Sequence, residues 1–339
     1  MKQKNVLNCQ FPSWYHIFKN VTFRSKIIPL QQDFIDYLNE DGIVLPSGND
    51  SPNEFIDNNE DEADSDEWSE SEEDTTATAT APVFEELTRK IEEAIESLGG
   101  AVFPKLNWSA PRDSAWISYN GTLKCTTPSD VYLLLKSSDR VSHDINQPFQ
   151  KCEDGEDNEM AESSGFVLVL RKWFEIPSST EFRCFVRKGH IIAVSQRDTA
   201  SHYPYIAEFY CDIHDQIKEF FHKKIANKFP DSDYVFDVFL QSKTVVKLVD
   251  FNPFGAVTDP LLFTWDELSK FQPDDEDEDD TMFRFVTSDA GVQPTPFLSS
   301  RLPKESLDLV TNEDINKMVD FLKTNEPNEV IDTSQNNDS

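Results

Sequence analysis

Three oxygen-bearing side chains stand in two neighbouring apolar segments of the sequence. Asp237 lies inside Tyr-Val-Phe-Asp-Val-Phe-Leu, and Asp250 and Asn252 close the next segment in Val-Asp-Phe-Asn-Pro-Phe-Gly. Carboxylate and amide oxygens are hard ligands that suit Mg²⁺, which usually keeps phosphate or water ligands as well. We therefore predict a magnesium site. In the alternative, each carboxylate ends a strand or pairs with a basic residue, because an ionised acid in an apolar strand needs compensation.

The spacing also predicts how these groups meet. Side chains alternate between the two faces of a strand, so Leu248, Asp250 and Asn252 are expected to share one face. If the turn lies at residues 242–243, Asp237 lies opposite Leu248, and Asp250 is its diagonal neighbour. Diagonal neighbours on one face are about 7–8 Å apart, close enough for two carboxylates to share a cation.

A magnesium-bound phosphate also needs cationic side chains. Candidates near the ends of apolar segments are Lys105, Arg112, Arg171, Lys172, Arg183 and Arg197. Arg183 alternates with Phe182 and Cys184, so we expect it on the face away from the apolar side. Any single one of these residues could instead be a solvated surface charge. Neither Gly-x-Gly-x-x-Gly nor a P-loop occurs, which excludes a Rossmann or P-loop phosphate site.

The elements that position these groups mix helical and strand patterns. Apolar spacing and capping signals predict helices over 31–38, 84–98, 128–135, 206–229 and 312–323, and a short helix opened by the capping box at 264–267. Apolar and β-branched runs predict strands over 101–108, 166–174, 181–187, 190–196, 234–240 and 244–251. We expect Ser129 to cap the helix that starts at Pro128. The mixture predicts an α+β fold of two lobes with mainly antiparallel sheets.

The acidity of the chain is concentrated in three runs. Residues 57–74 hold 11 acids, 153–162 hold six and 274–280 hold seven, with no Lys or Arg among them. Without these acids the net charge of −32 would be −8, an ordinary value for a folded domain. The runs are either solvated loops or a docking surface for a basic partner. Direct nucleic-acid binding is disfavoured because the sequence has no basic patch to displace counterions.

The predicted organisation follows these composition shifts. A first lobe covers 1–165, with a disordered acidic insertion at about 48–82. A second lobe, whose strands carry the predicted site for magnesium and ATP, covers 166–290. An extended Pro-rich arm, a helix and a polar tail cover 291–339.

Apolar runs, cysteines and histidines limit the class of protein. The longest apolar runs have five residues, whereas a membrane span needs about 20, and the first residues lack the apolar core of a secretory signal. The five cysteines are scattered without a Cys-x-x-Cys pair, and the six histidines include no His-x-x-x-His, which argues against a disulfide framework or a zinc site. We expect a cytoplasmic monomer that contacts no membrane.

Several longer motifs resemble one known family. They are Phe-Pro-Lys-Leu-Asn-Trp-Ser-Ala-Pro-Arg-Asp at 103–113, Leu-Arg-Lys-Trp at 170–173, Glu-Phe-Arg-Cys-Phe-Val at 181–186, Ser-Gln-Arg-Asp at 195–198 and Val-Asp-Phe-Asn-Pro-Phe-Gly at 249–255. Together they resemble the family of cell division cycle protein 123, in order along the chain. The resemblance implies an ATP-grasp-like fold that holds ATP and Mg²⁺ between two lobes. It also implies an assembly chaperone of translation initiation factor 2 that binds the gamma subunit, a GTPase, and promotes joining of the alpha subunit, and thereby supports translation initiation and cell-cycle progression.

The resemblance assigns roles to matching positions. Phosphates would be held by Lys105, Arg112 and Arg183, and Trp108 and Ala110 would border the nucleotide. The hinge would comprise Val169, Arg171 and Trp173. Magnesium would be bound by Asp237, Asp250 and Asn252, and the carboxy-terminal arm with the first lobe would bind the gamma subunit.

Two other function classes compete with this one. An ATP-grasp ligase would activate a carboxylate as an acyl phosphate for attack by an amine or thiol, but it needs a further pocket for which the sequence shows no signature. An acidic scaffold with an inactive fold is disfavoured by the intact set of two carboxylates and one amide. We therefore expect a binding protein rather than an enzyme.

Overall fold

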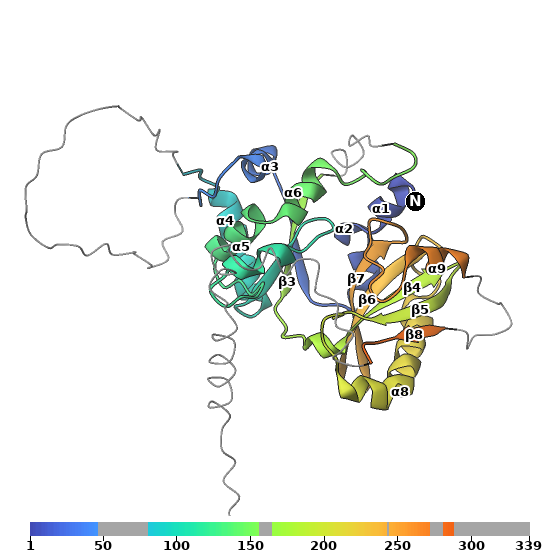
Figure 1. Ribbon diagram of the computed structural model, residues 1–339. Helices are drawn as coiled ribbons and strands as arrows, with labels where there is room; N and C mark the ends of the chain where they lie inside the picture. Colours follow the sequence, from blue (N-terminus) through green and yellow to red (C-terminus); the bar gives the residue numbers. More distant parts are fainter. Residues whose placement is uncertain (47–80, 156–164, 243, 272–280, 288–339) are drawn as a thin grey trace, which may run out of the picture. The chain divides into compact units, whose positions relative to one another are not determined.

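Two sheets organise the part of the chain that the computed structural model describes, namely residues 1–46, 81–155, 165–242, 244–271 and 281–287 (Figure 1). One sheet has three strands in the order β1-β3-β2, and the other has five in the order β7-β6-β4-β5-β8. All these elements belong to one compact unit, Met1–Thr295. Neighbouring strands are antiparallel except β5 and β8, which confirms the α+β class with mainly antiparallel sheets.

The three-stranded sheet packs four helices on one face. Its strands are β1 (Ser25–Pro29), β2 (Val102–Lys105) and β3 (Val167–Lys172). The helices are α3 (Gln32–Asn39), α4 (Glu85–Leu98), α5 (Pro128–Lys136) and α6 (Asp139–Asn146). Leu168 and Leu170 of β3 enter the same buried cluster as Phe34, Ile91 and Leu134 from these helices. Because side chains alternate along β3, Val169 and Arg171 lie on its other face.

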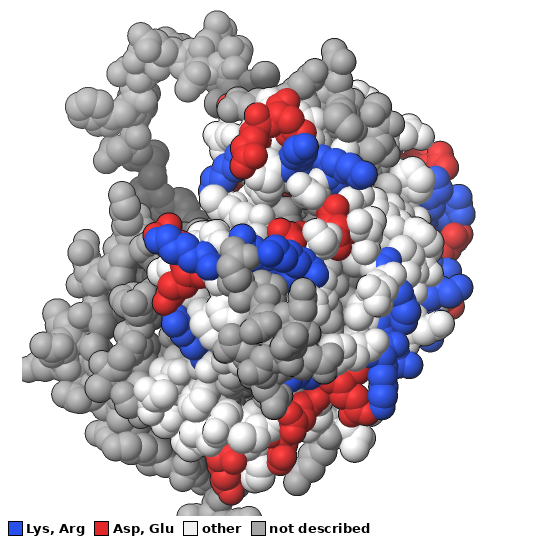
Figure 2. Space-filling model, turned by 90° about the vertical axis from the view of Figure 1, so that its right-hand side faces the viewer, with Lys and Arg blue, Asp and Glu red and all other residues white. Residues whose placement is uncertain are grey.

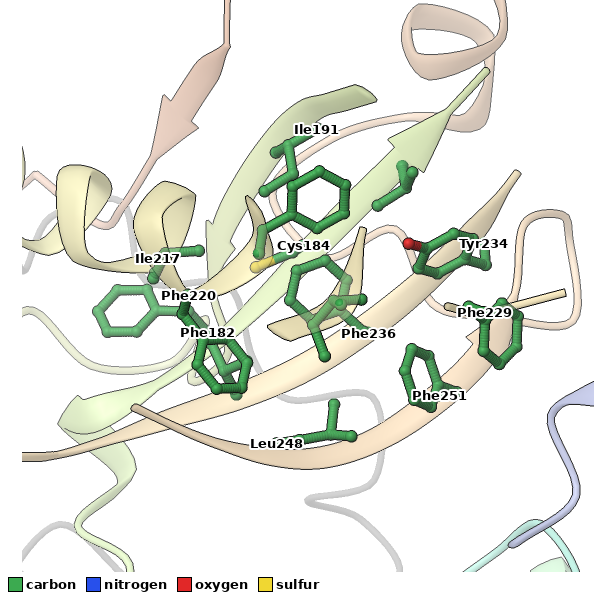
Figure 3. Packing of buried hydrophobic residues seen from close by; sticks show 14 of the residues in the cluster. Phe182, Cys184, Ile191, Ile217, Phe220, Phe229, Tyr234, Phe236, Leu248 and Phe251 are labelled. Atoms are coloured by element: carbon green, nitrogen blue, oxygen red, sulfur yellow. The ribbon is translucent and has the colours of Figure 1, made fainter. Parts of the chain in front are cut away.

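The five-stranded sheet is covered on one face by α8 (Pro204–Phe220), which continues into a π-helical turn over Phe221–Ile225. Its strands are β4 (Glu181–Arg187), β5 (His190–Gln196), β6 (Tyr234–Ser242), β7 (Val245–Pro253) and β8 (Met282–Arg284). Figure 3 shows the core on this face, where Ile217 and Phe220 lie near Phe182, and Phe236 and Phe251 continue the cluster toward Phe229. A smaller cluster on the other face includes Leu268 of α9 (Trp265–Lys270).

Two short helices near the start of the chain join this core. They are α1 (Gln3–Asn8) and α2 (Phe11–Phe18). The rings of Trp14 and Phe18 in α2 lie 5.4 and 5.0 Å from that of Phe251 in β7. The sequence indicated order in this region but not these elements.

The predicted strands and helices agree with the structure in most places and differ where turns intervene. The strand expected over 101–108 ends at Lys105, because Leu106 N–H already donates to the Ser109 carbonyl (3.0 Å) in a turn. The long helix ends at Ile225, not at Phe229, and Asn227 adopts a left-handed φ of 59°. The lobe boundary near residue 165 stays a prediction, and β3, which follows it, pairs with β1 and β2.

Several predicted features lie outside the described residues. They are the insertion at 48–82 apart from its last residues, most of the acidic run at 153–162, the run at 274–280, and the arm and helix beyond residue 291. Among the helices that the structure describes, none is both long and apolar enough to cross a membrane.

The cap of α5 is Thr127, so the prediction of Ser129 is wrong. Thr127 Oγ1 accepts a hydrogen bond from Asp130 N–H (3.2 Å), and Asp130 Oδ2 accepts one from Thr127 N–H (3.0 Å). This reciprocal box leaves Pro128 at the first helical position, where its missing N–H costs nothing.

We expect Thr127→Ala to lower the free energy of unfolding by about 1 kcal/mol, because an N-cap oxygen is lost. Ser129→Ala, two residues along, should change it by less than about 0.5 kcal/mol. Urea unfolding followed by circular dichroism compares the two. Equal losses in both variants would contradict the cap assignment.

Candidate functional site

Three charged residues form a row across neighbouring strands of the five-stranded sheet. Arg183 in β4 pairs with Asp237 in β6, and Asp237 pairs with Asp250 in β7. Phe236 and Val238, on either side of Asp237, belong to the core beneath α8. The alternation of side chains therefore places this row on the opposite face of the sheet.

The register of β7 differs from the prediction. Asp237 lies opposite Asp250 rather than Leu248, because the pairing shifts between Asp237 and Val238 and leaves Val249 as an extra residue. This β-bulge breaks the alternation, so Leu248 and Phe251 both enter the core beneath α8. Leu248 consequently does not share a face with Asp250, and the two carboxylates are direct rather than diagonal neighbours, about 4.5–5.5 Å apart at Cβ.

Asp237 is buried and held by Arg183 through two hydrogen bonds. Arg183 Nε and Nη2 donate to Oδ1 and Oδ2 of Asp237, each at 2.7 Å, and Nη1 donates to the Asp259 carbonyl at 2.8 Å. Arg197 Nε lies 3.7 Å from Asp237 Oδ2. Burial alone would raise the pKa of Asp237, but Arg183 and Arg197 lower it to about 2. Arg183 is thus largely occupied in positioning Asp237.

Asp250 connects the two sheets. Lys105, the last residue of β2, donates from Nζ to Asp250 Oδ2 at 2.6 Å, and Phe251 N–H donates to Asp250 Oδ1 at 3.1 Å. The Lys105 side chain is 1% exposed and that of Asp250 is 20% exposed. Burial lowers the pKa of Lys105, and Asp250 opposes that shift.

The donor set fits a hard divalent cation. Asp237 and Asp250 bring two carboxylates side by side, and Asn252 Nδ2 lies 3.4 Å from Asp237 Oδ2. Asp237 Oδ2 accepts from both Arg183 and Asn252, whereas Asp237 Oδ1 and the two oxygens of Asp250 each accept one hydrogen bond and keep a second lone pair. No cluster of three or more His, Cys, Asp or Glu suited to a metal occurs in the described parts of the chain. Magnesium here would bind two carboxylates and an amide, and would take its other ligands from phosphate or water.

The alternative considered from the sequence, that each carboxylate pairs with a basic residue, describes the contacts that the structure shows. Arg183 holds Asp237 and Lys105 holds Asp250. The magnesium site itself stays a prediction.

Arg171 of the predicted hinge is enclosed by aromatic rings. Its guanidinium carbon lies 5.1, 4.8 and 5.2 Å from the ring centres of Phe11, Phe23 and Phe103. Nη1 donates to the Val249 carbonyl at 2.8 Å, and Nη2 donates to Thr22 Oγ1 at 2.9 Å. Burial lowers the pKa of Arg171 to about 10. The side chain therefore ties β3 to β7 and is not presented to solvent.

The other two hinge residues take different positions. Val169 is fully buried and pairs with both Ile27 and Lys105, since β3 is the central strand. Trp173 lies just beyond β3, where its backbone N–H donates to the Ala101 carbonyl at 3.0 Å.

The loop that carries Trp108, Ala110 and Arg112 is anchored by Asp144 of α6. Ser109 donates to this carboxylate twice, from its N–H (2.7 Å) and from its hydroxyl (2.9 Å). Burial raises the pKa of Asp144 to about 6, although the Ser109 hydrogen bonds act against it. Sequence reasoning missed Asp144, because a single Asp in a polar helix carries no signal of a distant partner.

Side chains of this loop also make specific contacts. Trp108 Nε1–H donates to the Val6 carbonyl at 2.8 Å, and its ring lies 6.4 Å from that of Phe149. Arg112 starts a 3₁₀ turn (Arg112–Ile117), and its Nη2 lies 3.4 Å from Glu181 Oε1 at the start of β4. Arg112 therefore approaches the strand that holds Arg183.

Arg197 is a further cation at the site. It was among the basic candidates in the sequence, but no role was assigned to it. Burial and the neighbouring Arg183 lower its pKa to about 10. The motif Ser-Gln-Arg-Asp, which includes the last two residues of β5, was the signal that could have placed it next to Arg183.

Charges of both signs alternate on the described surface in Figure 2, without a large field of one sign. All of the run at 57–74 and all of the run at 274–280 fall outside the described residues. The excess of acid therefore belongs mostly to those segments.

Comparisons with known proteins now decide the family. A model of the D123 family matches residues 14–310. The chain belongs to the D123 family. It is 49% identical over 333 residues to the translation initiation factor eIF2 assembly protein of Xenopus laevis, covering 96% of this chain and 97% of that protein. The protein of the same name from Schizosaccharomyces pombe is 42% identical over 274 residues, 79% of each chain.

A solved structure of this family supports the fold. The structure of Cdc123 from Schizosaccharomyces pombe has a TM-score of 0.69 and 37% sequence identity, covering 85% of this chain and 99% of that one. The family resemblance found in the sequence is confirmed. The D123 match includes every predicted site residue, from Lys105 to Asn252.

The ion pair of Asp237 predicts a pH dependence. Asp237 has a pKa of about 2 in the folded chain and about 3.9 in an unfolded one. Its ionised form therefore stabilises the fold above about pH 4, and this contribution is lost as the pH falls toward about 2. At pH 7 we expect Asp237→Asn to lower the free energy of unfolding by about 3 kcal/mol, because Arg183 is left buried without its partner.

That loss should shrink by about 2 kcal/mol between pH 4 and pH 2, where the wild-type carboxylate becomes protonated. Denaturant titrations at several pH values measure it, with Asp212→Asn on the exposed side of α8 as the control. A difference that stays constant across this range would show that Arg183 does not hold an ionised Asp237.

Proposed function

We propose that this chain is an assembly factor for eIF2 that binds magnesium and ATP at the row of Asp237 and Asp250. The observation that carries the assembly role is its identity of 49% with the eIF2 assembly protein of Xenopus laevis across nearly the full length of both chains. Proteins this similar over their whole length share a fold, and the predicted site residues lie within the matched family region.

The nucleotide part of the proposal draws its support from the arrangement of charge. Two adjacent carboxylates with an amide beside them suit Mg²⁺, and Lys105, Arg112 and Arg197 supply positive charge around them for phosphates. Magnesium would supply charge neutralisation between carboxylate and phosphate. Asp144 would orient the loop of Trp108 and Ala110 along the nucleotide.

The partner within eIF2 is, in our proposal, the gamma subunit. A chain with a net charge of −32 and three acidic runs is suited to a basic protein surface, because complementary charge speeds encounter. ATP serves as a bound ligand in this proposal, and assembly does not depend on turnover.

Asp250→Ala should weaken ATP binding in the presence of Mg²⁺ at least roughly tenfold, about 1.4 kcal/mol, because one anionic metal ligand is lost. Isothermal titration calorimetry measures this, with Asp212→Asn as the matched control. Unchanged affinity in Asp250→Ala would contradict the metal assignment. Phosphate release by the wild-type protein at a steady rate would favour the ligase or an ATPase instead.

Capture of separate eIF2 subunits tests the partner. The immobilised chain should retain purified gamma subunit and, after its addition, alpha subunit, but not alpha alone. Capture should fall several-fold between 0.1 and 1 M salt, because exposed charges are screened over a shorter distance at high salt. Retention of alpha without gamma would contradict the assignment of the gamma subunit.

A further inference from the structure

The two carboxylates of the site differ in how firmly their cationic partners are held. Arg183 grips Asp237 through two bonds of 2.7 Å and is anchored a third time at the Asp259 carbonyl. Lys105 donates one hydrogen bond of 2.6 Å to Asp250, and a lysine side chain is a chain of rotatable bonds. A lysine ammonium is a point charge that can turn to another acceptor, whereas a bidentate arginine is fixed by its planar geometry. Lys105 is therefore the cation that can change partners.

Burial strengthens the attraction between Lys105 and Asp250. Lys105 is 1% exposed, so water does not offer it an alternative acceptor, and its ammonium also lies 5.3 Å from the centre of the Phe11 ring. Because Asp250 already compensates the positive charge of Lys105, a metal-free phosphate gains less from that ammonium, even though Lys105 has two further N–H donors. The same phosphate is also repelled by the negative charges of Asp237 and Asp250.

A divalent cation would reverse the effect of Asp250 on the binding of nucleotide. With Asp250 as a ligand of Mg²⁺, its charge would be neutralised, and the charge of Lys105 would be available to phosphate. The same carboxylate thus weakens the binding of metal-free nucleotide and strengthens the binding of its magnesium complex.

We propose that Asp250 is the residue that makes the site select magnesium-bound nucleoside triphosphate over the metal-free form, by holding Lys105 until a metal takes its place. This inference rests on the proposed function and adds a specificity-determining role to a predicted metal ligand. It also assigns Arg183 to positioning Asp237 rather than to the phosphates.

Calorimetry of ATP binding in Mg²⁺ and in excess EDTA tests the proposal with Asp250→Asn, which keeps the shape of the side chain and removes its charge. In Mg²⁺ the variant should bind roughly tenfold more weakly than wild type. In EDTA it should bind at least about threefold more tightly, because Lys105 is released and a repulsive charge is gone. Asp212→Asn, on the exposed side of α8, should change neither affinity.

The double variant Lys105→Met/Asp250→Asn separates release of Lys105 from general repulsion. If Asp250 acts through Lys105, most of the gain in EDTA should disappear in the Lys105→Met background. A gain of equal size in both backgrounds would overturn the exchange of partners.

The remaining outcomes are also decisive. Weaker or unchanged binding by Asp250→Asn in EDTA, with ATP bound normally by wild type in Mg²⁺, would overturn this inference and leave the proposed function standing. No ATP binding by wild type in Mg²⁺ would overturn both. Should Asp250→Asn fail to fold, Asp250→Ser repeats the measurement with a smaller neutral side chain.

Discussion

The buried contact between Lys105 and Asp250 is the constraint on which the arrangement of the site depends. It joins the last residue of β2 to β7, across 145 positions of sequence, and it is the point where a charge of one sheet meets a charge of the other. From there the charges continue through Asp237 to Arg183 on adjacent strands. A buried lysine that lost this carboxylate would be left uncompensated, so the two sheets and the site stabilise each other.

A single irregularity makes that contact available. Because Val249 is extra in β7, the strand presents Leu248 and Phe251 to the core and still turns Asp250 to the opposite face. The bulge also frees the Val249 carbonyl from the strand ladder, and Arg171 of the other sheet donates to it at 2.8 Å. Thr22 completes the junction, since its hydroxyl donates to the Leu248 carbonyl at 2.7 Å and accepts from Arg171. The same departure from regular pairing thus places a carboxylate and binds the sheets.

The sequence could predict the residue types of the site better than their contacts. An Asp inside an apolar strand stands out locally, and β4 and β5 have the predicted bounds because Lys188 and Gly189, both with positive φ, form a tight turn between two β-branched runs. The bulge at Val249 has no such local signature, so the predicted register was wrong. The partners of Lys105, Arg171 and Asp144 come from distant segments, and no pattern within a strand or helix specifies them. Lys105 and Arg171 were predicted as candidates for phosphate contact, yet they are the most deeply buried cations of the site.

The bulge at Val249 has a consequence for how the length of β7 can vary among related chains. A deletion of this one residue would restore regular pairing of Asp237 with Asp250 and Val238 with Leu248, so the five-stranded sheet itself would tolerate it. The deletion would, however, remove the Val249 carbonyl that accepts from Arg171, and so the hydrogen bond that connects β3 to β7. The number of residues in β7 is therefore constrained by the neighbouring sheet. An insertion or deletion there would be tolerated only if Arg171 of β3 kept its hydrogen bond to a β7 carbonyl.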